Sequence, residues 1–333
     1  MKALVINGKN EPLQLEERGE LQAGPGEAIV QVKAAAVNHR DVWIQKGQYA
    51  GLRYPITPGS DGAGIVESVG VGTGAEWRGK EVIINPAFNW GESLLYQSPK
   101  NFSILGLPED GTFAEYVRVP ISSLVEKPAH LSFEEAAALP LAGVTAYRAV
   151  FTRAQLQPGE KVLITGIGGG VALFALQYAV SAGAKAYVSS GTDEKIEKAM
   201  AMGATGGVNY KNPDWGRSLQ ELAGAFDVII DGAAGDGMDE LLNLASPGGR
   251  LAFYGATRGN PSSLTARRIF WKQLTILGST MGSPEDFRSM IAFAGKHTLR
   301  PIVDKVFSFA EGEAAFRWMD NAHQFGKIVV RIQ

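Results

Sequence analysis

Short runs of hydrophobic residues alternate with polar residues over the first 120 positions of the chain. The runs AIVQVKAAAV (28–37), GIVESVG (64–70), EVIINP (81–86) and GTFAEYVRVP (111–120) have the alternation typical of β-strands, and Gly and Pro separate them. This part of the sequence has no long helical pattern. We therefore predict that the N-terminal part is built from β-strands.

From about residue 130 the pattern changes to strands that alternate with helices. KVLITGI (161–167) and KAYVSS (185–190) are typical of buried strands, and FDVIIDGA and RLAFYGA follow them; GGVALFALQYAVSAGA (169–184) and DEKIEKAMAMGA (193–204) are typical of helices. Such βαβ alternation predicts a parallel sheet covered on both faces. Two helices near residues 283–295 and 311–322 and a strand at 327–332 could complete either part.

Composition limits the class of protein. The 333 residues are 45% hydrophobic with a net charge of -2, and acidic and basic residues are interspersed, which favours a soluble globular protein and disfavours nucleic acid or an anionic membrane as partner. The N-terminal apolar run is too short for a signal sequence or a membrane span, so we expect a cytoplasmic protein. The complete absence of cysteine excludes disulfides, thiolate nucleophiles and thiolate metal sites.

A glycine-rich turn between a strand and an apolar helix is the strongest local motif. Without side chains at its glycines, a pyrophosphate can approach the backbone and the helix N-terminus. In a G-x-G-x-x-G/A alignment Ile167 takes the place of the first glycine, so Gly166 or Gly168 would have to form that turn. A turn without a ligand is the alternative. The candidate cofactor-binding residues here are Gly168, Gly169, Gly170 and Val171.

The end of the second strand favours NADPH over NADH. It ends in Ser189, Ser190 and Gly191, whereas NAD-preferring proteins usually place an acidic residue there. The Ser190 hydroxyl and the nearby Lys195 could donate hydrogen bonds to a 2′-phosphate. The alternative for Lys195 is a solvated residue in the first turns of a helix.

Several motifs in order along the whole chain resemble the medium-chain dehydrogenases and reductases, specifically the zinc-free, quinone-oxidoreductase-like branch. They are AAAVNHRDVWIQKGQY (34–49), YPITPGSDGAGIVESVG (54–70), GTFAEYVRVP (111–120), EEAAALPLAGVTAY (134–147) and the glycine turn. The resemblance implies an α/β fold: a GroES-like β-rich catalytic domain (1–123 and 281–333) and a Rossmann domain with a doubly wound parallel sheet (124–280), with the active site in the cleft between them.

The resemblance also implies roles for single residues. GTDEK (191–195) and VNY (208–210) lie where NADPH-using relatives bind the 2′-phosphate, so Lys195 and Tyr210 are candidates. Thr145 matches a position near the nicotinamide and its ribose. Relatives form homodimers by pairing edge strands of the nucleotide domains, and we expect RLAFYGA with TILGSTMG to do so here.

The zinc ligands of the metal-dependent relatives are replaced in this sequence. In those relatives the position of Asn38 is a cysteine, the stretch around Ser60 and Asp61 reads Gly-His-Glu, and a third cysteine lies near LPLAG. Asn38 and Ser60 are poor zinc ligands, so we predict no metal site, with a weak oxygen-rich site as the alternative. The 85–111 stretch resembles the structural zinc lobe with its cysteines substituted. We expect a lid, a dimer contact or an apolar cluster there, the cluster formed by Phe88, Trp90, Leu94, Leu95, Tyr96, Phe102 and Ile104.

Loss of zinc favours a particular reaction. Reduction of a quinone or of an α,β-unsaturated carbonyl spreads negative charge over a conjugated system, which hydrogen-bond donors can stabilise. Asn38 is the first candidate for the active site. Asp41 could orient Asn38 or a cofactor hydroxyl, or it could cap a helix. Tyr49 could donate a hydrogen bond or a proton, or it could form a wall. His39 is not assigned as a base. The alternatives are a zinc-type alcohol dehydrogenase-like enzyme with unusual ligands and a non-catalytic nucleotide-binding module.

Overall fold

The computed structural model describes residues 1–72 and 74–333, and the chain divides into two compact units. Unit 1 comprises Met1–Ala142 and Ser283–Gln333, and unit 2 comprises Gly143–Gly282. The first boundary lies after Ala142, whereas the sequence placed it after residue 123. The reason is helix α2 (Phe133–Ala138), which packs on strands of unit 1 and therefore belongs to that unit.

Unit 1 is built around a seven-stranded sheet with the strand order β16-β17-β3-β4-β5-β9, in which β8 also pairs with β3. All the pairs are antiparallel except β16 with β17. The predicted β-rich part is confirmed. The strands are β3 (Glu27–Val37), β4 (Asp61–Val69), β5 (Glu81–Ile84), β8 (Tyr116–Pro120), β9 (Leu124–Glu126), β16 (Val303–Ser308) and β17 (Lys327–Arg331).

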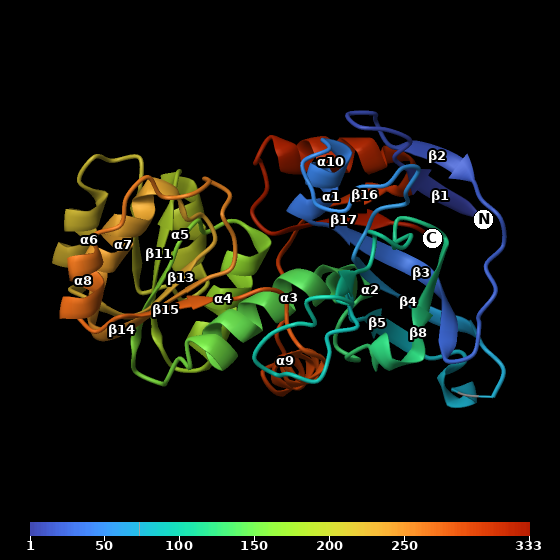
Figure 1. Cartoon of the computed structure of the whole chain (residues 1–333), viewed down its shortest axis with the longest axis horizontal. Helices are drawn as coiled ribbons and strands as arrows, with labels where there is room; N and C mark the ends of the chain where they lie inside the picture. Colours follow the sequence, from blue (N-terminus) through green and yellow to red (C-terminus); the bar gives the residue numbers. More distant parts are fainter. Residues whose placement is uncertain (73) are drawn as a thin grey trace. The chain divides into compact units, whose positions relative to one another are not determined.

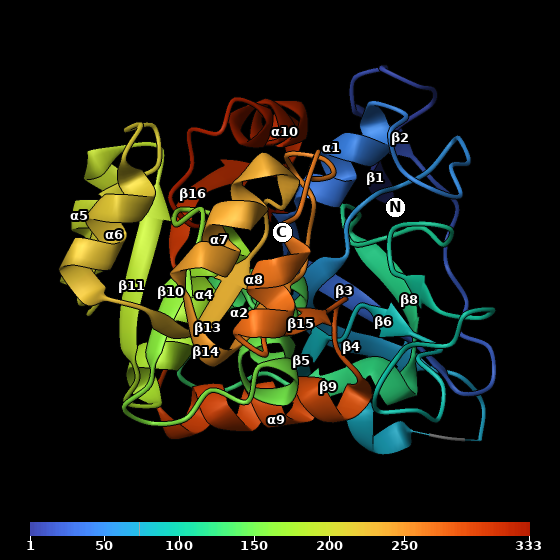
Figure 2. The same ribbon diagram turned by 60° about the vertical axis from the view of Figure 1, so that its left-hand side comes forward.

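Smaller elements complete unit 1. The C-terminal segment, which the sequence left unassigned between the two parts, supplies β16, β17 and two helices to this unit. Helices α1 and α10 lie side by side (Figures 1 and 2). The remaining elements are β1 (Lys2–Val5), β2 (Gln14–Glu17), α1 (His39–Gln45), β6 (Ala87–Phe88), β7 (Ser103–Ile104), α9 (Pro284–Lys296), α10 (Gly312–Asp320) and the 3-10 turns Ala75–Trp77, Ile121–Ser123 and Phe309–Glu311.

Strand β3 is buried on both faces. One face packs into the main core of unit 1, where Phe113 and Phe316 meet edge to face at 5.6 Å, and α2 contacts the strand as well. A register shift between Val32 and Ala34 interrupts the strict alternation of the strand. As a result, Val32 and then Ala35 contribute to the same core, three positions apart rather than two.

Unit 2 is a six-stranded, all-parallel sheet with the order β12-β11-β10-β13-β14-β15, which confirms the predicted doubly wound sheet. Helices α6, α7 and α8 contact one another in sequence and gather on one side of the sheet (Figure 1). The strands are β10 (Lys161–Ile164), β11 (Lys185–Ser190), β12 (Gly206–Asn209), β13 (Phe226–Asp231), β14 (Ala245–Phe253) and β15 (Thr275–Gly278).

The helices of unit 2 follow its strands in the expected alternation. Helix α3 crosses the boundary between the units and continues as a π-helical turn. The helices are α3 (Pro140–Tyr147), the π-helix Arg148–Arg153, α4 (Gly170–Ser181), α5 (Asp193–Ala201), α6 (Trp215–Ala223), the 3-10 turn Gly235–Gly237, α7 (Met238–Leu244) and α8 (Ala266–Trp271).

One of the two expected pairing strands is not at the edge of the sheet. RLAFYGA overlaps β14, which pairs with β13 on one side and β15 on the other, so its backbone groups are already used. Only the segment TILGSTMG, which contains β15, lies at an edge. This part of the expectation is therefore wrong.

The predicted apolar cluster of the 85–111 stretch forms only in part. Phe88 and Trp90 are buried, and Trp90 meets Phe102 edge to face at 5.6 Å. Leu94, Leu95 and Tyr96 are instead 61%, 72% and 59% exposed. They lie in a loop whose ends are joined by a backbone hydrogen bond from Ser98 to Trp90, which leaves the middle of the loop at the surface.

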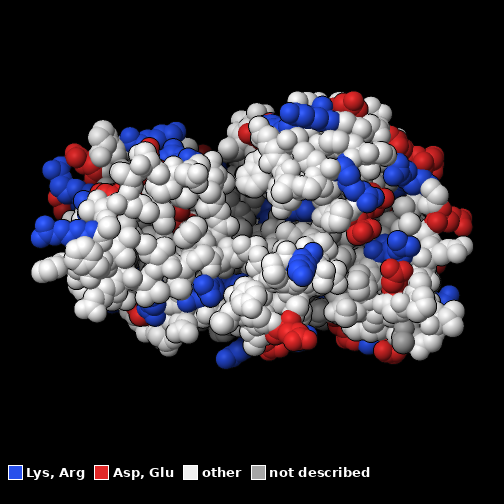
Figure 3. Space-filling view, in the orientation of Figure 1, with Lys and Arg blue, Asp and Glu red and all other residues white. Residues whose placement is uncertain are grey.

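The distribution of charged side chains and the length of the helices can be compared with what nucleic acid or a membrane would require. On the face shown in Figure 3, acidic and basic side chains are interspersed. Within the described residues, every helix is too short or too polar to cross a membrane.

The glycine of β4 nearest to β3 provides a test of this packing. A Cβ at Gly64 would lie 2.0 Å from the carbonyl oxygen of Gln31, a backbone atom that cannot swing away. We expect Gly64→Ala to lower the free energy of unfolding by about 3 kcal/mol. Denaturant unfolding measures this, with Gly19→Ala as control, because a Cβ there meets nothing within 4 Å. Equal stability of the two variants would contradict the close approach of β3 and β4.

Candidate functional site

Four buried polar residues of unit 1, Asn38, Asp41, Asp61 and Lys327, form one cluster. The sheet register explains why they meet. Ala36 in β3 is paired with Asp61, the first residue of β4, and Val37 is paired with Ile328 in β17. The end of β3 therefore lies between the first residues of two neighbouring strands, so residues distant in sequence converge.

Lys327 is the cation of this cluster and is only 3% exposed. Its Nζ donates to the Val37 carbonyl at 3.0 Å, to Asn38 Oδ1 at 2.7 Å and to Asp61 Oδ2 at 2.9 Å. The other oxygen of Asp61 accepts the Leu141 backbone N–H at 2.7 Å. The buried charges are thus paired and hydrogen-bonded, as burial of ionised groups requires. No sequence motif marks Lys327, because KIVVRI shows only the hydrophobic pattern of a strand.

The side-chain amide of Asn38 has a defined orientation. A lysine ammonium only donates hydrogen bonds, so the atom that faces Lys327 is the amide oxygen. The amide nitrogen then faces Asp61 and donates to Oδ2 at 2.9 Å. One of its two N–H bonds is used in this way, and the second is a further donor. Asn38 is 6% exposed.

Asp41 caps helix α1, the alternative that the sequence left open. Its Oδ2 accepts the backbone N–H of Asn38 at 2.8 Å, which forms the capping box of α1. Its Oδ1 is buried and has no hydrogen-bond partner among the described residues. The pKa of Asp41 is raised to about 6. Burial is the largest cause and the nearby Asp61 carboxylate acts in the same direction, while Arg40, the Asn38 N–H and Lys327 lower the pKa in part.

Arg40, which the sequence analysis did not single out, connects Ser60 and Tyr49. Its Nη1 donates to Ser60 Oγ at 2.6 Å and to the Leu105 carbonyl at 2.8 Å. Its Nε donates to the Tyr49 hydroxyl at 3.4 Å, and the guanidinium lies 5.0 Å from the centre of that ring. Tyr49, half-buried, keeps its own O–H proton for another acceptor.

The turn before β4 contains Gly59, and two features of the structure require glycine there. Gly59 has φ +108°, and a Cβ there would lie 2.6 Å from Thr112 Oγ1. Thr112 Oγ1 in turn donates to the Asp61 backbone carbonyl at 2.7 Å. The close approach of Thr112 therefore fixes the backbone of Asp61, and it requires glycine at position 59.

His39 follows Asn38 at the start of α1. Its pKa lies below the ordinary value because surrounding protein atoms desolvate the imidazole and because Lys327 repels a positive charge there. Its ring contacts Trp43 with a centroid separation of 5.9 Å.

In unit 2 both candidate glycines form the turn that follows β10. Gly166 and Gly168 have φ +65° and +116°, and α4 begins at Gly170 with Gly169 as its N-cap. The order of the strands reverses at β10: β11 and β12 lie on one side of it, and β13, β14 and β15 lie on the other. The turn after β10 therefore lies at the position where parallel α/β sheets bind ligands. A Cβ at Gly168 would lie 2.7 Å from Lys195 Cδ, so the Lys195 side chain covers the turn.

The residues that follow β11 and β12 meet at Gly191. A Cβ on Gly191 would lie 2.8 Å from the Tyr210 hydroxyl and 3.3 Å from Lys211 Cε. The Arg258 guanidinium lies 5.1 Å from the centre of the Tyr210 ring. Neither Lys211 nor Arg258 was among the residues predicted from the sequence. Lys211 directly follows the VNY motif, whereas no motif marks Arg258.

Two further candidates are buried. The Ser190 hydroxyl lies 3.3 Å from the Ile167 carbonyl, to which it donates, and accepts the Thr192 N–H at 3.4 Å, so its proton is directed at the backbone. Thr145 is buried in α3. The structure thus brings Asn38, Asp41, Ser60 and Asp61 together in unit 1. In unit 2 it brings together Gly168 with Lys195, and Gly191 with Tyr210.

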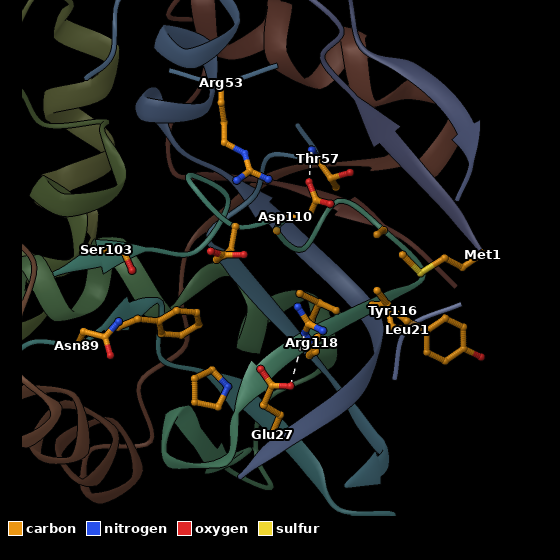
Figure 4. Close-up of a pocket in the computed structure, with 16 residues that line it drawn as sticks. Met1, Leu21, Glu27, Arg53, Thr57, Asn89, Ser103, Asp110, Tyr116 and Arg118 are labelled. Carbon is orange, nitrogen blue, oxygen red and sulfur yellow. Dashed lines mark hydrogen bonds and ion pairs between the residues drawn. The ribbon is translucent and has the colours of Figure 1, made fainter. Parts of the chain in front are cut away.

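A separate pocket of about 400 Å³ lies elsewhere in unit 1 (Figure 4). Several of its charged side chains interact with neighbouring groups: Asp110 accepts the Thr57 N–H at 2.9 Å, and Arg118 lies 3.6 Å from Glu27. None of the clustered residues around Lys327 lines it. The pocket is lined by residues 1, 21, 27, 53, 57, 88, 89, 103, 109–111, 114, 116–118 and 120.

A doubly wound unit with a glycine turn, together with a β-rich unit carrying a buried polar site, defines a nucleotide-binding oxidoreductase. Residues 24–129 match the family described as alcohol dehydrogenase GroES-like domain, and residues 170–296 match the family described as zinc-binding dehydrogenase. The chain belongs to the medium-chain dehydrogenase/reductase superfamily.

Relatives span almost the whole chain. A zinc-type alcohol dehydrogenase-like protein YogA of Leptosphaeria maculans is 35% identical over 96% of this chain and 95% of the relative. An acryloyl-coenzyme A reductase of Metallosphaera sedula is 29% identical over 99% of both chains. Quinone oxidoreductase-like protein 2 of Rattus norvegicus is 28% identical over 100% of this chain and 92% of the relative. The crystal structure of an NAD-dependent alcohol dehydrogenase matches with a TM-score of 0.95 and 35% identity over 100% of both chains.

The zinc ion that the family description implies does not fit the residues of this site. Asn38 Oδ1 and Asp61 Oδ2 both face the Lys327 ammonium, which would repel a divalent cation placed on the same oxygens. Ser60 Oγ is bonded to Arg40 and Leu105. Across residues 1–72 and 74–333, no group of three or more His, Cys, Asp or Glu side chains is arranged to hold a metal.

The raised pKa of Asp41 predicts that this residue lowers the free energy of unfolding as the pH rises. Because the folded-state pKa lies above the ordinary 3.8, the neutral carboxyl favours the fold below about pH 4, and this advantage is lost as the pH rises through about 6. Asp41→Asn removes the ionisation but retains an oxygen for the cap. We expect the free energy of unfolding of Asp41→Asn, relative to wild type, to rise by on the order of 2 kcal/mol between pH 4 and pH 8.

Urea unfolding at several pH values measures this difference. Asp41→Ala serves as the control, because it loses the helix cap at every pH and should be less stable than Asp41→Asn throughout. A pH-independent difference between wild type and Asp41→Asn would show that the carboxyl does not titrate in this range.

Proposed function

We propose that the chain is an NADPH-dependent oxidoreductase that reduces a quinone or an α,β-unsaturated carbonyl without a metal ion. The observation that carries this proposal is the Lys327 ammonium, which lies 2.7 Å from Asn38 Oδ1 and 2.9 Å from Asp61 Oδ2, the oxygens that a metal would need. A site without a Lewis acid is poorly suited to stabilise a localised alkoxide. It suits acceptors whose negative charge spreads over a conjugated system.

The cofactor would be held by unit 2. The turn at Gly166 and Gly168 leaves backbone room for a pyrophosphate at the N-terminus of α4. Lys195, Lys211 and Arg258 supply positive charge beside this turn and beside Tyr210, which suits the extra phosphate of NADPH. When bound, the reduced nicotinamide supplies the hydride.

The residues of unit 1 would stabilise the substrate oxygen. The second N–H of Asn38 donates to the oxygen of the quinone or enone and stabilises the negative charge that develops there. The Tyr49 hydroxyl, which already accepts from Arg40, is a second donor. Asp41 holds the backbone N–H of Asn38 and so fixes the start of α1. Water then provides the proton that completes the product.

The relatives support this reaction class. One is named for the reduction of acryloyl-coenzyme A, a conjugated carbonyl compound, and another is named a quinone oxidoreductase-like protein. The zinc-type relative favours the competing function of alcohol oxidation. That function would require a metal at a site where Lys327 already supplies the positive charge.

We also propose that the protein is a homodimer formed through β15. This strand lies at an edge of the sheet of unit 2. Phe270 and Trp271 at the end of α8, just before it in the chain, are 66% and 74% exposed. An open strand edge, with exposed aromatic side chains in the helix that precedes it in the chain, suits pairing with a second copy.

The choice of cofactor is tested by Lys195→Ala. Removing one charge-assisted donor should raise the dissociation constant of NADPH about tenfold and change that of NADH by less than about twofold. Lys198→Ala is the matched control, because this lysine lies on the same helix and pairs with Glu194. Fluorescence titration measures both constants. Equal affinity of wild type for the two nucleotides would remove the basis for NADPH.

The reaction is tested by following NADPH absorbance with a panel of quinones, enones, simple aldehydes and primary alcohols. We expect turnover of quinones or enones that does not change when a chelator or zinc is added. Asn38→Ala should lower kcat about 100-fold with little effect on NADPH binding, as expected for loss of one donor to a developing charge.

Asn85→Ala is the control for the loss of a buried asparagine. Asn85 lies in unit 1 outside the site, and its Oδ1 accepts the Ala87 backbone N–H, so its loss should leave kcat within about twofold of wild type. Alcohol oxidation stimulated by zinc would favour the zinc-dependent alternative. Tight NADPH binding without turnover of any compound would favour a non-catalytic module.

A further inference from the structure

We propose that Lys327 is a positioning residue that replaces the catalytic cation: its buried ammonium holds and polarises the Asn38 amide, which then acts on the substrate oxygen. The inference rests on the proposed function, because it assumes that Asn38 contacts the substrate. It adds a residue that lies 289 positions away in sequence and that acts only through Asn38.

Lys327 itself has no hydrogen left for a substrate. An ammonium has three N–H donors, and Val37, Asn38 and Asp61 supply three acceptors at 2.7–3.0 Å. The side chain is also almost fully buried. Lys327 can therefore influence the reaction through the groups that it touches. Of these, Asn38 has two amide N–H donors, and among residues 1–72 and 74–333 one acceptor is recorded for them.

Lys327 and Asp61 polarise the Asn38 amide in the same sense. The positive charge on Lys327 draws electron density toward the amide oxygen, and the negative Asp61 oxygen accepts a hydrogen from the amide nitrogen. Both effects favour the resonance form with a C=N double bond and a partial positive charge on nitrogen. The remaining N–H becomes a stronger donor, in the way that a metal ion would strengthen the polarisation of a bound carbonyl.

The arrangement also fixes the charge permanently in the site. A metal ion can dissociate, whereas Lys327 is covalently part of β17 and is balanced by Asp61, whose second oxygen is held by the Leu141 N–H. The Asn38 amide must place its oxygen toward Lys327 and its nitrogen toward Asp61, which fixes the orientation of the amide plane. The donor is thus oriented before a substrate arrives.

The amide of Asn38 provides a direct readout in the wild-type protein and in Lys327→Met. Nitrogen-15 labelling of asparagine allows its two N–H signals to be observed by NMR, and they are identified by their absence in Asn38→Ala. A polarised amide rotates slowly about its C–N bond. We expect rotation in Lys327→Met to be about tenfold faster or more, a change that loss of packing at a distance would not produce.

Activity provides the second readout. In Lys327→Met we expect kcat to fall about 10- to 100-fold, the kinetic isotope effect with NADPH deuterated at the transferred position to rise, and NADPH affinity to stay within about twofold. Lys327→Arg should recover part of kcat. Lys272→Met is the matched control, since this lysine also donates three hydrogen bonds, although its acceptors are three backbone carbonyls of unit 2. It should alter neither kcat nor the Asn38 signals.

If Lys327→Met does not fold, the neutral pair Lys327→Gln with Asp61→Asn replaces it, because no unpaired charge is then buried. Unchanged rotation of the Asn38 amide, or unchanged kcat and isotope effect in an active protein, would overturn the inference. A wild-type protein that reduces no quinone or enone would instead contradict the proposed function, and the rotation rate would still decide whether Lys327 polarises Asn38.

Discussion

The ion pair between Lys327 and Asp61 links three strands of unit 1 at one buried point. It joins the first residues of β4 and β17 across the end of β3, and both charges are withdrawn from water. Such a pair is stable only if each remaining polar atom finds a partner. Asn38, Val37 and Leu141 supply those partners. The orientation of the Asn38 amide, the start of α1 and the entry into α3 all follow from this requirement.

The fold was largely predictable from the sequence, because it depends on patterns that recur over many residues. The alternation of strands and helices after residue 130 predicts a parallel sheet, and the glycine turn predicts the junction between β10 and α4. Single interactions were harder to predict. Leu94, Leu95 and Tyr96 are as hydrophobic as Trp90, yet only loop geometry decides that they remain exposed.

The candidate site was predictable in its residues near Asn38 but not in its cation. Asn38, Asp41, Ser60 and Asp61 lie in motifs that attract attention through their polar residues among glycines. Lys327 begins an ordinary hydrophobic strand, and its partner becomes evident only when the register places it beside Asp61. No local pattern in the sequence indicates an ion pair between two residues that lie 266 positions apart.

The order of elements in the chain has a consequence for synthesis on the ribosome. Strands β3 and β4 emerge early, whereas β17 emerges only after the whole of unit 2. Until then, Asp61 lacks its counter-charge, and the edge of β3 that β17 will cover remains open. All the strands of unit 2 are therefore synthesised before the sheet of unit 1 can receive its last strand.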